Sequence, residues 1–378
     1  MAAPTETYVD PSIAGNSGAG TIGDPYGDLQ HALDTMTRDA TNGDRINIKA
    51  GTDEILTGTI SLATYGTPTL SATLTFQGYT SAAGDGGQGG IDGNATYNIH
   101  TAAGDGIQWK DLRLHNCGSA AVVGLARFGI LENCEIDNTT GDGVQIFGIG
   151  WASCVGCHIH NIGGYGINHE DGAQAFIFAN YLVNGANDFS VAIRTDFSTG
   201  SIAHNIISID GASIGIETDG SGPYGIRIFN NSVLSDGGTG VGIQIDRVLA
   251  QGCFNNLVEG FSGAGGGGIV VAAGATVEDA HIMAHNAVYN CTTNYSYSHS
   301  HFVLVNDNES VSVSPFAKSG ADTFANRFAH FAPVDTGNVY GGAYPSGSNH
   351  DKGAVQHAAG PGGPLNSNQG AVIIVENA

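Results

Sequence analysis

The sequence predicts an all-β protein, a single-stranded right-handed parallel β-helix of about 8–11 coils with three short strands in each coil. Three observations support this fold class. The 378 residues include 59 glycines, and only 12% of the residues are charged. A register held by asparagine, with Asp or Gly in two places, recurs at steps mostly of about 22 to 26 residues, the last being 30, which suits one coil of a solenoid. Short segments of alternating apolar residues, typical of strands, lie between glycine-rich turns.

The two ends of the chain are predicted to be caps. In the N-terminal cap, residues 1–44, the stretch "YGDLQHALDTM" (26–36) is a short amphipathic helix with Leu29, Ala32, Leu33 and Met36 on one face. This face would cover the open end of an apolar core. The coils are expected over residues 45–315, beginning with "DRINIKAGT" (44–52). Residues 316–378 are irregular and rich in Gly and Pro, and we expect a C-terminal cap or tail there.

A recurring residue marks a bend in each predicted coil. The positions are Asn133, Asn180, Asn205, Asn231, Asn256 and Asn286, with Asp111 and Gly156 in two further places. Asn, Asp and Gly tolerate the left-handed backbone conformation at low cost. Coils stacked ~4.8 Å apart would pair every strand with its neighbours above and below. A leucine-rich repeat would need an L-x-x-L-x-L frame, which is absent, and a propeller blade would need about 40 residues.

A second set of aligned segments carries acids at its end. It reads "DGVQIF" (142–147), "YGINHE" (165–170), "VAIRTD" (191–196), "IGIETD" (214–219), "VGIQID" (241–246) and "GGIVVA" (267–272). With Ile167, Ile193, Ile216 and Ile243 pointing inward, alternation sends two columns of side chains outward. The outer columns are Phe147, Glu170, Asp196, Asp219, Asp246 and Ala272, and beside them Gln145, Asn168, Arg194, Glu217, Gln244 and Val270.

Four stacked carboxylates repel one another, at a cost of about 1 kcal/mol per contact in water. A Ca²⁺ ion would remove this repulsion, because hard cations bind several carboxylate oxygens. Pairing with Arg194, or protonation of one carboxyl as in a glycosidase acid, would also reduce it. The simplest alternative is that these acids only start turns, as Asp-Gly pairs do.

The carboxylate column therefore defines three sets of candidate residues. The catalytic candidates are Glu170, Asp196, Asp219 and Arg194, the binding candidates are Asn168, Glu217, Gln244 and Phe147, and the candidate Ca²⁺ ligands are Glu170, Asp196, Asp219 and Asp246. Carboxyls one coil apart suit the ~5 Å spacing of retaining glycosidases, and those two coils apart suit the longer spacing of inverting ones.

A second ladder follows the bend. Aligning "LRLHN" (112–116), "CEIDN" (134–138) and "CHIHN" (157–161) gives the outward columns Arg113–Glu135–His158 and His115–Asp137–His160. Two histidines and an aspartate suit a transition metal, and charge-complementary cross-strand pairs explain the same pattern without one. Cys134 and Cys157 align one coil apart, which fits either a disulfide or a stack of thiols. The C-x-x-C pair Cys154 and Cys157 has no second pair, and we expect it to be buried in the strand stack.

The asparagine ladder and the coil layout, over about residues 45–315, resemble the pectate-lyase-like β-helix superfamily. This resemblance implies that the bend separates the second strand from the third, and that the acid-bearing segments form the first sheet. It also implies glycan cleavage along the first sheet, commonly with an Arg or Lys base and a neutralised uronate. Arg194 is the only basic residue of the patch, and the Asn-Thr-Asp, Asp-pair and Gly-His-Gly motifs of the pectin-hydrolase branch are absent. The two ends of the chain resemble β-helix proteins of bacteriophages and environmental bacteria.

The net charge of the chain makes some classes of binding partner unfavourable. The chain has 35 acidic and 12 basic residues and a net charge of −23, which argues against nucleic acid or an anionic membrane. No apolar segment is long enough to insert into a membrane as a span. The start "MAAPTETYVD" lacks the basic and apolar regions of a signal peptide, so we expect trimming or release by another route, such as host lysis.

Two functions fit these features. We favour a structural or receptor-binding protein of a virion surface, such as a phage spike, fibre or capsid decoration. It would be extracellular, would form a homotrimer or bind other virion proteins, and would bind polysaccharide. The alternative is an extracellular polysaccharide lyase or glycoside hydrolase that uses the carboxylate column.

Overall fold

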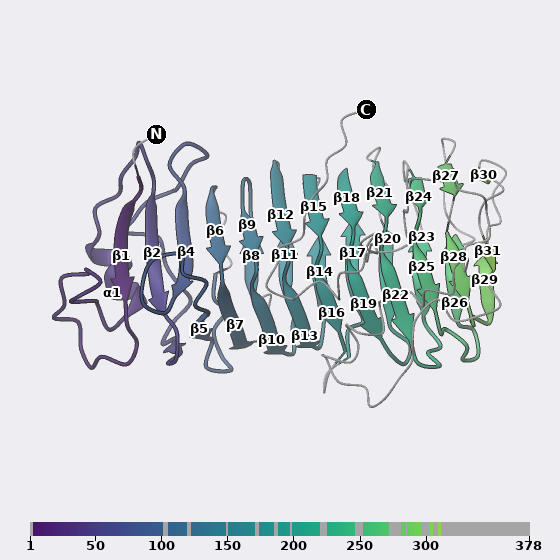
Figure 1. Ribbon diagram of the computed structural model, residues 1–378, viewed down its shortest axis with the longest axis horizontal. Helices are drawn as coiled ribbons and strands as arrows, with labels where there is room; N and C mark the ends of the chain where they lie inside the picture. Colours follow the sequence, from purple (N-terminus) through teal and green to yellow (C-terminus); the bar gives the residue numbers. More distant parts are fainter. Residues whose placement is uncertain are drawn as a thin grey trace, which may run out of the picture.

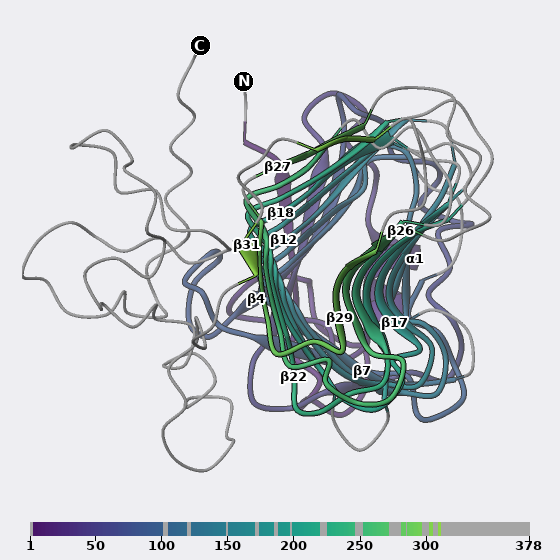
Figure 2. The same cartoon turned by 90° about the vertical axis from the view of Figure 1, so that its right-hand side faces the viewer.

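The computed structural model describes residues 3–100, 105–118, 122–148, 150–170, 174–184, 188–196, 199–219, 225–245, 252–271, 281–284, 286–296, 302–304 and 309–310. These residues form coils stacked along one long axis, and the strands of successive coils make three parallel sheets that run along it (Figure 1). This confirms the predicted parallel β-helix. The end view in Figure 2 shows the coils superposed. Asp246, Ala272 and the predicted C-terminal cap lie outside the described residues.

The first sheet has eight strands. They are β8 (Val123–Leu125), β11 (Val144–Ile146), β14 (Tyr165–His169), β17 (Val191–Asp196), β20 (Ile214–Asp219), β23 (Val241–Ile245), β26 (Gly267–Val271) and β29 (Thr293–Ser296).

The second sheet has twelve strands. They are β1 (Thr5–Val9), β2 (Asp44–Lys49), β4 (Leu74–Tyr79), β6 (Ile107–Lys110), β9 (Ile130–Glu132), β12 (Trp151–Val155), β15 (Gln174–Phe178), β18 (Thr199–Ala203), β21 (Ile226–Phe229), β24 (Gly252–Phe254), β27 (His281–Ala284) and β30 (Phe302–Leu304).

The third sheet has eleven strands. They are β3 (Glu54–Ile55), β5 (Gly89–Asp92), β7 (Leu112–Cys117), β10 (Glu135–Thr139), β13 (His158–Ile162), β16 (Tyr181–Val183), β19 (Ile206–Ile209), β22 (Ser232–Ser235), β25 (Leu257–Glu259), β28 (Ala287–Tyr289) and β31 (Glu309–Ser310).

Each coil from β6 to β29 gives one strand to the second, third and first sheets in that order. The eight strands of the first sheet therefore define eight complete coils among the described residues, within the predicted range. The bend that contains Asn180 separates β15 from β16, so it lies between the second and third sheets, as the superfamily resemblance implied.

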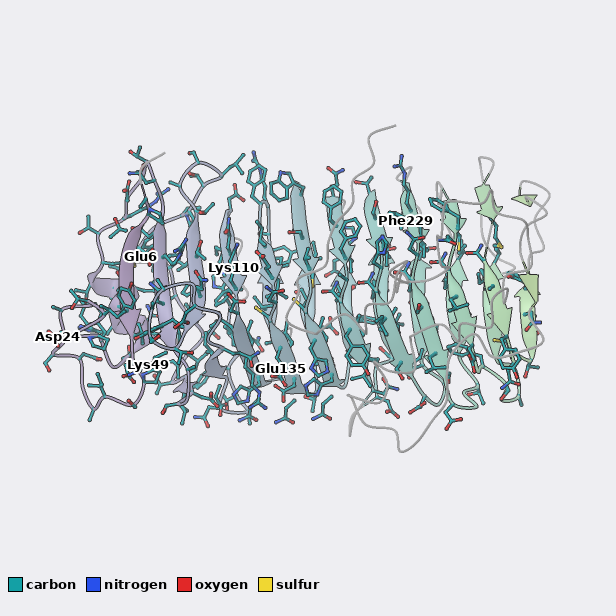
Figure 3. The ribbon with its side chains drawn as sticks, in the orientation of Figure 1. Glu6, Asp24, Lys49, Lys110, Glu135 and Phe229 are labelled. Atoms are coloured by element: carbon teal, nitrogen blue, oxygen red, sulfur yellow. The ribbon has the colours of Figure 1, made fainter. Side chains whose placement is uncertain are left out.

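The core is built from side chains that stack in register. Ile167, Ile193, Ile216 and Ile243 of the first sheet pair in successive coils and are fully buried. Burial of one such side chain contributes about 1.5–3 kcal/mol. Most charged side chains project outward instead, and Figure 3 shows Lys110 on the second sheet and Glu135 on the third.

Asparagine side chains form a buried ladder at the bend between the second and third sheets. The side-chain oxygen of Asn231 accepts from the main-chain N–H of Asn205 at 3.1 Å and from its side-chain amide at 3.0 Å. The Asn231 amide donates in turn to the Ile202 carbonyl at 2.9 Å. The same pattern repeats from Asn180 to Asn286. These bonds satisfy main-chain groups that burial would otherwise leave unpaired.

The prediction that these asparagines are themselves left-handed is wrong. The left-handed residue is the preceding one, with φ of 54°, 57°, 56° and 56° at Ala179, His204, Asn230 and Asn255. Asparagine is needed in the ladder for its amide rather than for its backbone freedom, because the amide bridges two coils. Asp111, Asn133 and Gly156 are left-handed, as predicted, and therefore belong to the preceding column.

Cysteine takes the ladder position in the two coils before Asn180. Cys134 and Cys157 align one coil apart, as predicted, and both are buried free thiols. The Cys157 Sγ lies 3.7 Å from the Leu131 carbonyl, the counterpart of the carbonyl that accepts from the Asn180 amide one coil later. A stack of thiols thus replaces amides here, and Cys154 is buried as expected.

The predicted N-terminal helix is present as α1 (Leu29–Thr35) at one end of the stack (Figure 1), with Leu29, Ala32 and Leu33 buried. The Asp28 carboxylate accepts from the His31 N–H and caps the helix. Glu54 of β3 accepts from the Leu29 N–H at 3.2 Å, which ties the helix to the first coil. Among the described residues, no helix has the length and apolar character needed to cross a membrane.

Candidate functional site

The two outward columns of the first sheet lie where alternation predicts. Arg194 pairs with Asn168 on one side and with Glu217 on the other, and Glu217 pairs with Gln244. Asp196 pairs directly with Asp219 one coil later. The regular repeat is therefore sufficient to stack these side chains, and no bulge interrupts the two pairs of strands that carry them.

Glu170 and Phe147 continue the outer column. The Glu170 N–H donates to the Ile146 carbonyl at 2.9 Å, and the Phe147 N–H donates to the Leu125 carbonyl at 3.1 Å. Each residue therefore keeps the first-sheet register just past the end of its strand. We call Glu170, Arg194, Asp196, Glu217 and Asp219 the carboxylate face.

Arg194 is the centre of the carboxylate face. Its Nη2 donates to the Asp196 Oδ2 at 3.1 Å and to the Asp219 Oδ2 at 3.2 Å, and its Nε lies 3.9 Å from the Glu217 Oε2. Its Nη1 donates to the Asn168 Oδ1 at 3.4 Å, and its guanidinium lies 5.2 Å from the centre of the Tyr165 ring. One cation thus serves three carboxylates, and the face keeps an excess of negative charge.

The carboxyls of Asp196 and Asp219 have different surroundings. The Asp196 side chain is 19% exposed and that of Asp219 is 44% exposed. Burial raises the pKa of Asp196, with help from the charges of Asp219 and Glu170, while Arg194 acts in the opposite direction. The Asp196 Oδ1 is buried and has no hydrogen-bond partner among the described residues. Burial lowers the pKa of Arg194, but the hydrogen bond to Asp219 and the charges of Tyr165, Asp196 and Asp219 outweigh it, so that the pKa is raised.

Amides flank the carboxylate face. The Gln145 amide donates to Glu170, and the Gln244 amide donates to Glu217 at 3.5 Å. The Asn168 amide donates to Asp142 at 3.2 Å, and this aspartate was missed by the sequence argument. Asp142 precedes its strand instead of ending it, so the column of strand-end acids did not include it.

The proposed calcium ligands do not converge in the described part of the chain. Glu170, Asp196 and Asp219 are not among the groups of three ligand atoms that lie within 4.8 Å of one another. Arg194 already bonds to both Asp196 and Asp219. Pairing with this arginine therefore reduces the repulsion between the two carboxylates without requiring a Ca²⁺ ion. Asp246 lies outside the described residues.

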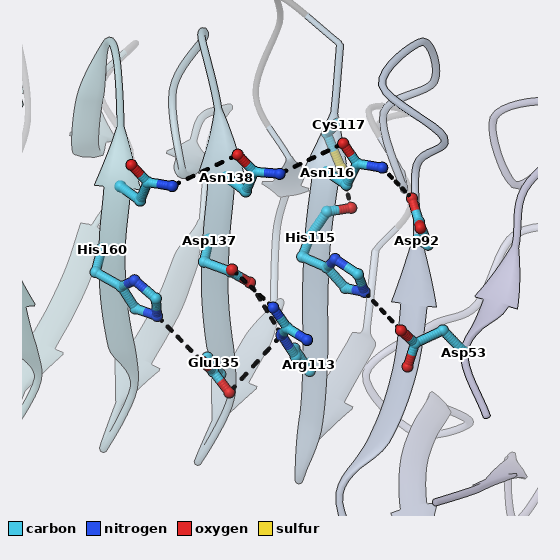
Figure 4. A network of polar contacts seen from close by, with 11 residues as sticks. Asp53, Asp92, Arg113, His115, Asn116, Cys117, Glu135, Asp137, Asn138 and His160 are labelled. Atoms are coloured by element: carbon cyan, nitrogen blue, oxygen red, sulfur yellow. Dashed lines mark hydrogen bonds and ion pairs between the residues drawn. The ribbon is translucent and has the colours of Figure 1, made fainter. Parts of the chain in front are cut away.

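The outer side of the third sheet carries the second predicted ladder, here called the histidine face (Figure 4). It consists of His158, placed by the pairing of the strands, and of Arg113, His115, Glu135, Asp137 and His160, which Figure 4 labels. The predicted pairs are present, since Glu135 lies opposite His158 and Asp137 lies opposite His160.

Most contacts on the histidine face are diagonal rather than directly opposite. Arg113 donates to both oxygens of Asp137, at 3.2 and 2.9 Å, and His160 Nε2 lies 3.0 Å from the Glu135 Oε1. His115 Nε2 lies 3.1 Å from the Asp53 Oδ2. The predicted metal trio of His115, Asp137 and His160 is therefore not brought together, because each of its three members is held by another partner.

Glu135, His158 and His160 converge in its place. Their ligand atoms all lie within 4.8 Å of one another. Burial and the neighbouring His160 lower the pKa of His158 to about 4. The hydrogen bond from His160 lowers the pKa of Glu135, with Arg113 adding to the effect.

Comparisons with known proteins reveal the fold but no family. No protein-family model and no curated protein matches the sequence. Among solved structures, the chain is similar to pectate lyase Pel9A, with a TM-score of 0.56 and 13% identity over 95% of this chain and 98% of that one. GH136 lacto-N-biosidase from Eubacterium ramulus gives a TM-score of 0.47 and 12% identity, over 79% of this chain and 68% of that one. The protein has the pectate-lyase-like parallel β-helix fold.

Proposed function

We propose that the protein cleaves a polysaccharide at the carboxylate face, as a glycoside hydrolase whose reacting groups are Asp196 and Asp219. The observation that carries this proposal is the direct pairing of the two residues, with an oxygen of each bonded to the same nitrogen of Arg194. The fold similarity to a pectate lyase supports a glycan as substrate. The choice of hydrolysis over a lyase reaction rests on the side chains of the carboxylate face.

The two carboxyls suit opposite roles. Asp196 is half-buried and has a raised pKa, which favours a protonated carboxyl that can donate to the glycosidic oxygen. Asp219 is more exposed, with 44% of its side chain accessible, which suits the carboxylate that attacks the sugar. Adjacent coils lie ~4.8 Å apart, close to the ~5–5.5 Å between the carboxyls of retaining enzymes. We therefore expect retention of configuration.

Arg194 holds the carboxyls of Asp196 and Asp219 in place before and after the proton is transferred. When Asp196 loses its proton to the leaving group, the Nη2 of Arg194 is already 3.1 Å from its oxygen and stabilises the new charge. Arg194 is unsuited to be the base of a lyase, because three carboxylates stabilise its cationic form. Of the four lysines, Lys49 and Lys110 lie outside the first-sheet strands, and Lys318 and Lys352 are not among the described residues.

Other sequence-based expectations stay predictions. A Ca²⁺ ion on the carboxylate column, an extracellular location, a homotrimer and the absence of nucleic-acid or membrane partners belong to this group. The virion-surface function that we favoured from the sequence finds no support among the structural neighbours. Their enzymatic names support the alternative, an enzyme acting on polysaccharides.

The test is cleavage of a panel of neutral and acidic polysaccharides by the full chain, with Ca²⁺ and with a chelator. Reducing ends and unsaturated uronate products are measured separately. We expect reducing ends without unsaturated products, and a loss of about 10²–10⁴-fold in Asp196→Asn and in Asp219→Asn. Glu132→Gln is the control, because Glu132 pairs with Lys110 on the second sheet.

Two results would overturn the proposal. One is unsaturated product, which would make the protein a lyase. The other is the absence of cleavage across the panel, or cleavage that survives in both aspartate variants. Loss of activity only in the chelator would instead support the predicted calcium ion.

A further inference from the structure

We infer that Glu135, His158 and His160 form a binding site for a divalent first-row transition metal, with Zn²⁺ as the probe. This site is on the third sheet and is independent of the proposed hydrolysis at the first sheet. Two imidazoles and one carboxylate are a ligand set that zinc, nickel, copper and iron accept.

The register of the β-helix builds the site. Glu135 on β10 pairs directly with His158 on β13. His160 follows two residues later on the same strand, so it projects from the same face. The rings of His158 and His160 are stacked, with 4.2 Å between centroids and 26° between planes. Two neighbouring coils therefore contribute three donor groups to one place.

The donor spacing fits a metal ion. His160 Nε2 and Glu135 Oε1 are 3.0 Å apart, close to the ~3.3 Å between two ligand atoms that each lie about 2.0–2.1 Å from a tetrahedral zinc ion. The third donor, from His158, completes a group that lies within 4.8 Å, so a modest side-chain rotation brings it to the ion. Side-chain exposures of 24% for His160 and 27% for Glu135 leave a route from solvent.

The surrounding charges leave the carboxylate available. Arg113 is the nearest cation, with its Nε 4.0 Å from the Glu135 Oε2. Its stronger contact is the two-pronged one to Asp137, which offsets its charge (Figure 4). Tyr181 of the next coil stacks on His158 with 5.3 Å between centroids and forms one wall. Three protein ligands leave a coordination position open for water or another small ligand.

Metal uptake by the full-length chain tests this inference. Metal-free protein is titrated with ZnCl₂ in a calorimeter, and Co²⁺ is added separately to read the ligand field from its visible spectrum. We expect one tight ion per chain and a Co²⁺ spectrum of low coordination number. Glu135→Gln and His160→Gln should each weaken binding by at least about 10- to 100-fold, the range seen when even outer-shell partners of metal ligands are removed.

His115→Gln is the matched control, because His115 lies on the same face but is held by Asp53. It should bind zinc like the wild type, and melting curves without metal show whether each variant is folded. The inference is overturned if the wild type takes up no zinc, or if the two ligand variants and the control weaken binding equally. If both ligand variants fail to fold, the Co²⁺ spectrum of the wild type decides, and the octahedral spectrum of free aqueous Co²⁺ counts against the site.

Discussion

The carboxylate face and the histidine face come from the same repeat but balance their charges differently. On the carboxylate face, Arg194 alone is within 4 Å of three carboxylates. On the histidine face, three basic groups each make their closest contact with a different carboxylate: Arg113 with Asp137, His115 with Asp53 and His160 with Glu135. Stacking in register therefore does not itself produce an excess of one charge.

This difference separates a structural ladder from a candidate active site. Opposite charges across strands stabilise a sheet, and like charges directly opposite destabilise it. The histidine face follows this rule through its diagonal pairs. The pairing of Asp196 with Asp219 breaks the rule, and Arg194 offsets it only in part. A local arrangement that costs stability is more common at functional sites than elsewhere.

The largest expected effect comes from removing the central cation of each face. Arg194→Gln should lower the free energy of unfolding by about 2–4 kcal/mol at pH 7, because it leaves Asp196 and Glu217 uncompensated in a half-buried place. Arg113→Gln should cost less, about 1–2 kcal/mol, because Arg113 is 40% exposed and Glu135 keeps His160, so that only Asp137 loses its partner. Urea unfolding of both variants measures the difference. An equal loss would mean that the two faces are balanced alike.

The fold and the register were predictable from the sequence because both follow from periodicity. The neighbours of Arg194, namely Asn168 and Glu217, are those that strict alternation gives. The same argument placed Glu135 opposite His158. The alternation within each strand leaves few alternative registers, since a shift by one residue would expose the isoleucine stacks.

The contacts between side chains were not predictable. Long side chains reach the diagonal neighbour as easily as the opposite one, so rotamers decide that His160 bonds to Glu135 and not to Asp137. Asn133 was misplaced in the ladder for a different reason. Asparagine suits both the left-handed position and the amide ladder, and these positions are adjacent in the chain. Sequence alone does not distinguish the two uses.

The pH dependence of stability also contains a contribution from Glu54, which lies on neither face. This contribution must be removed before the two faces are compared by pH. Burial raises the pKa of Glu54 to about 7 from an ordinary value of 4.5, with Asp28 adding to the effect. Its contribution to stability is fully present below pH 4.5 and is lost as the pH rises through about 7. The wild type should therefore lose about 2 kcal/mol of unfolding free energy over this pH range. Glu54→Gln keeps an acceptor for the Leu29 N–H but does not ionise, so this variant should not show the loss.

The measurement is the free energy of unfolding at several pH values between 4 and 8 for both proteins. Glu132→Gln, an exposed acid on the second sheet, serves as the control and should leave the pH dependence unchanged. A wild-type curve that is already flat in this range would show that Glu54 is not a buried acid with a raised pKa.

The smallest expected effect is the change in stability when one aspartate of each face is replaced by asparagine, and its sign differs between the two faces. The raised pKa of Asp196 means that its ionised form is unfavourable in the folded state, so its contribution to stability is present below its ordinary pKa of 3.8 and is lost as the pH rises. Asp196→Asn should therefore stabilise the protein at neutral pH by about 0.5–1 kcal/mol, since Arg194 keeps Glu217 and Asp219. Asp137→Asn should destabilise it by about 1 kcal/mol or more, because Asp137 is buried against Arg113.

Thermal unfolding at pH 7 and at pH 3 measures both substitutions, and the gain from Asp196→Asn should vanish at the lower pH. If Asp196→Asn also destabilises the protein, the acidic column is a structural ladder like the histidine face. A gain in stability combined with lost hydrolysis has a different meaning. It would show that the charge of Asp196 opposes folding and is kept for the reaction, because a purely structural column would gain nothing from retaining it.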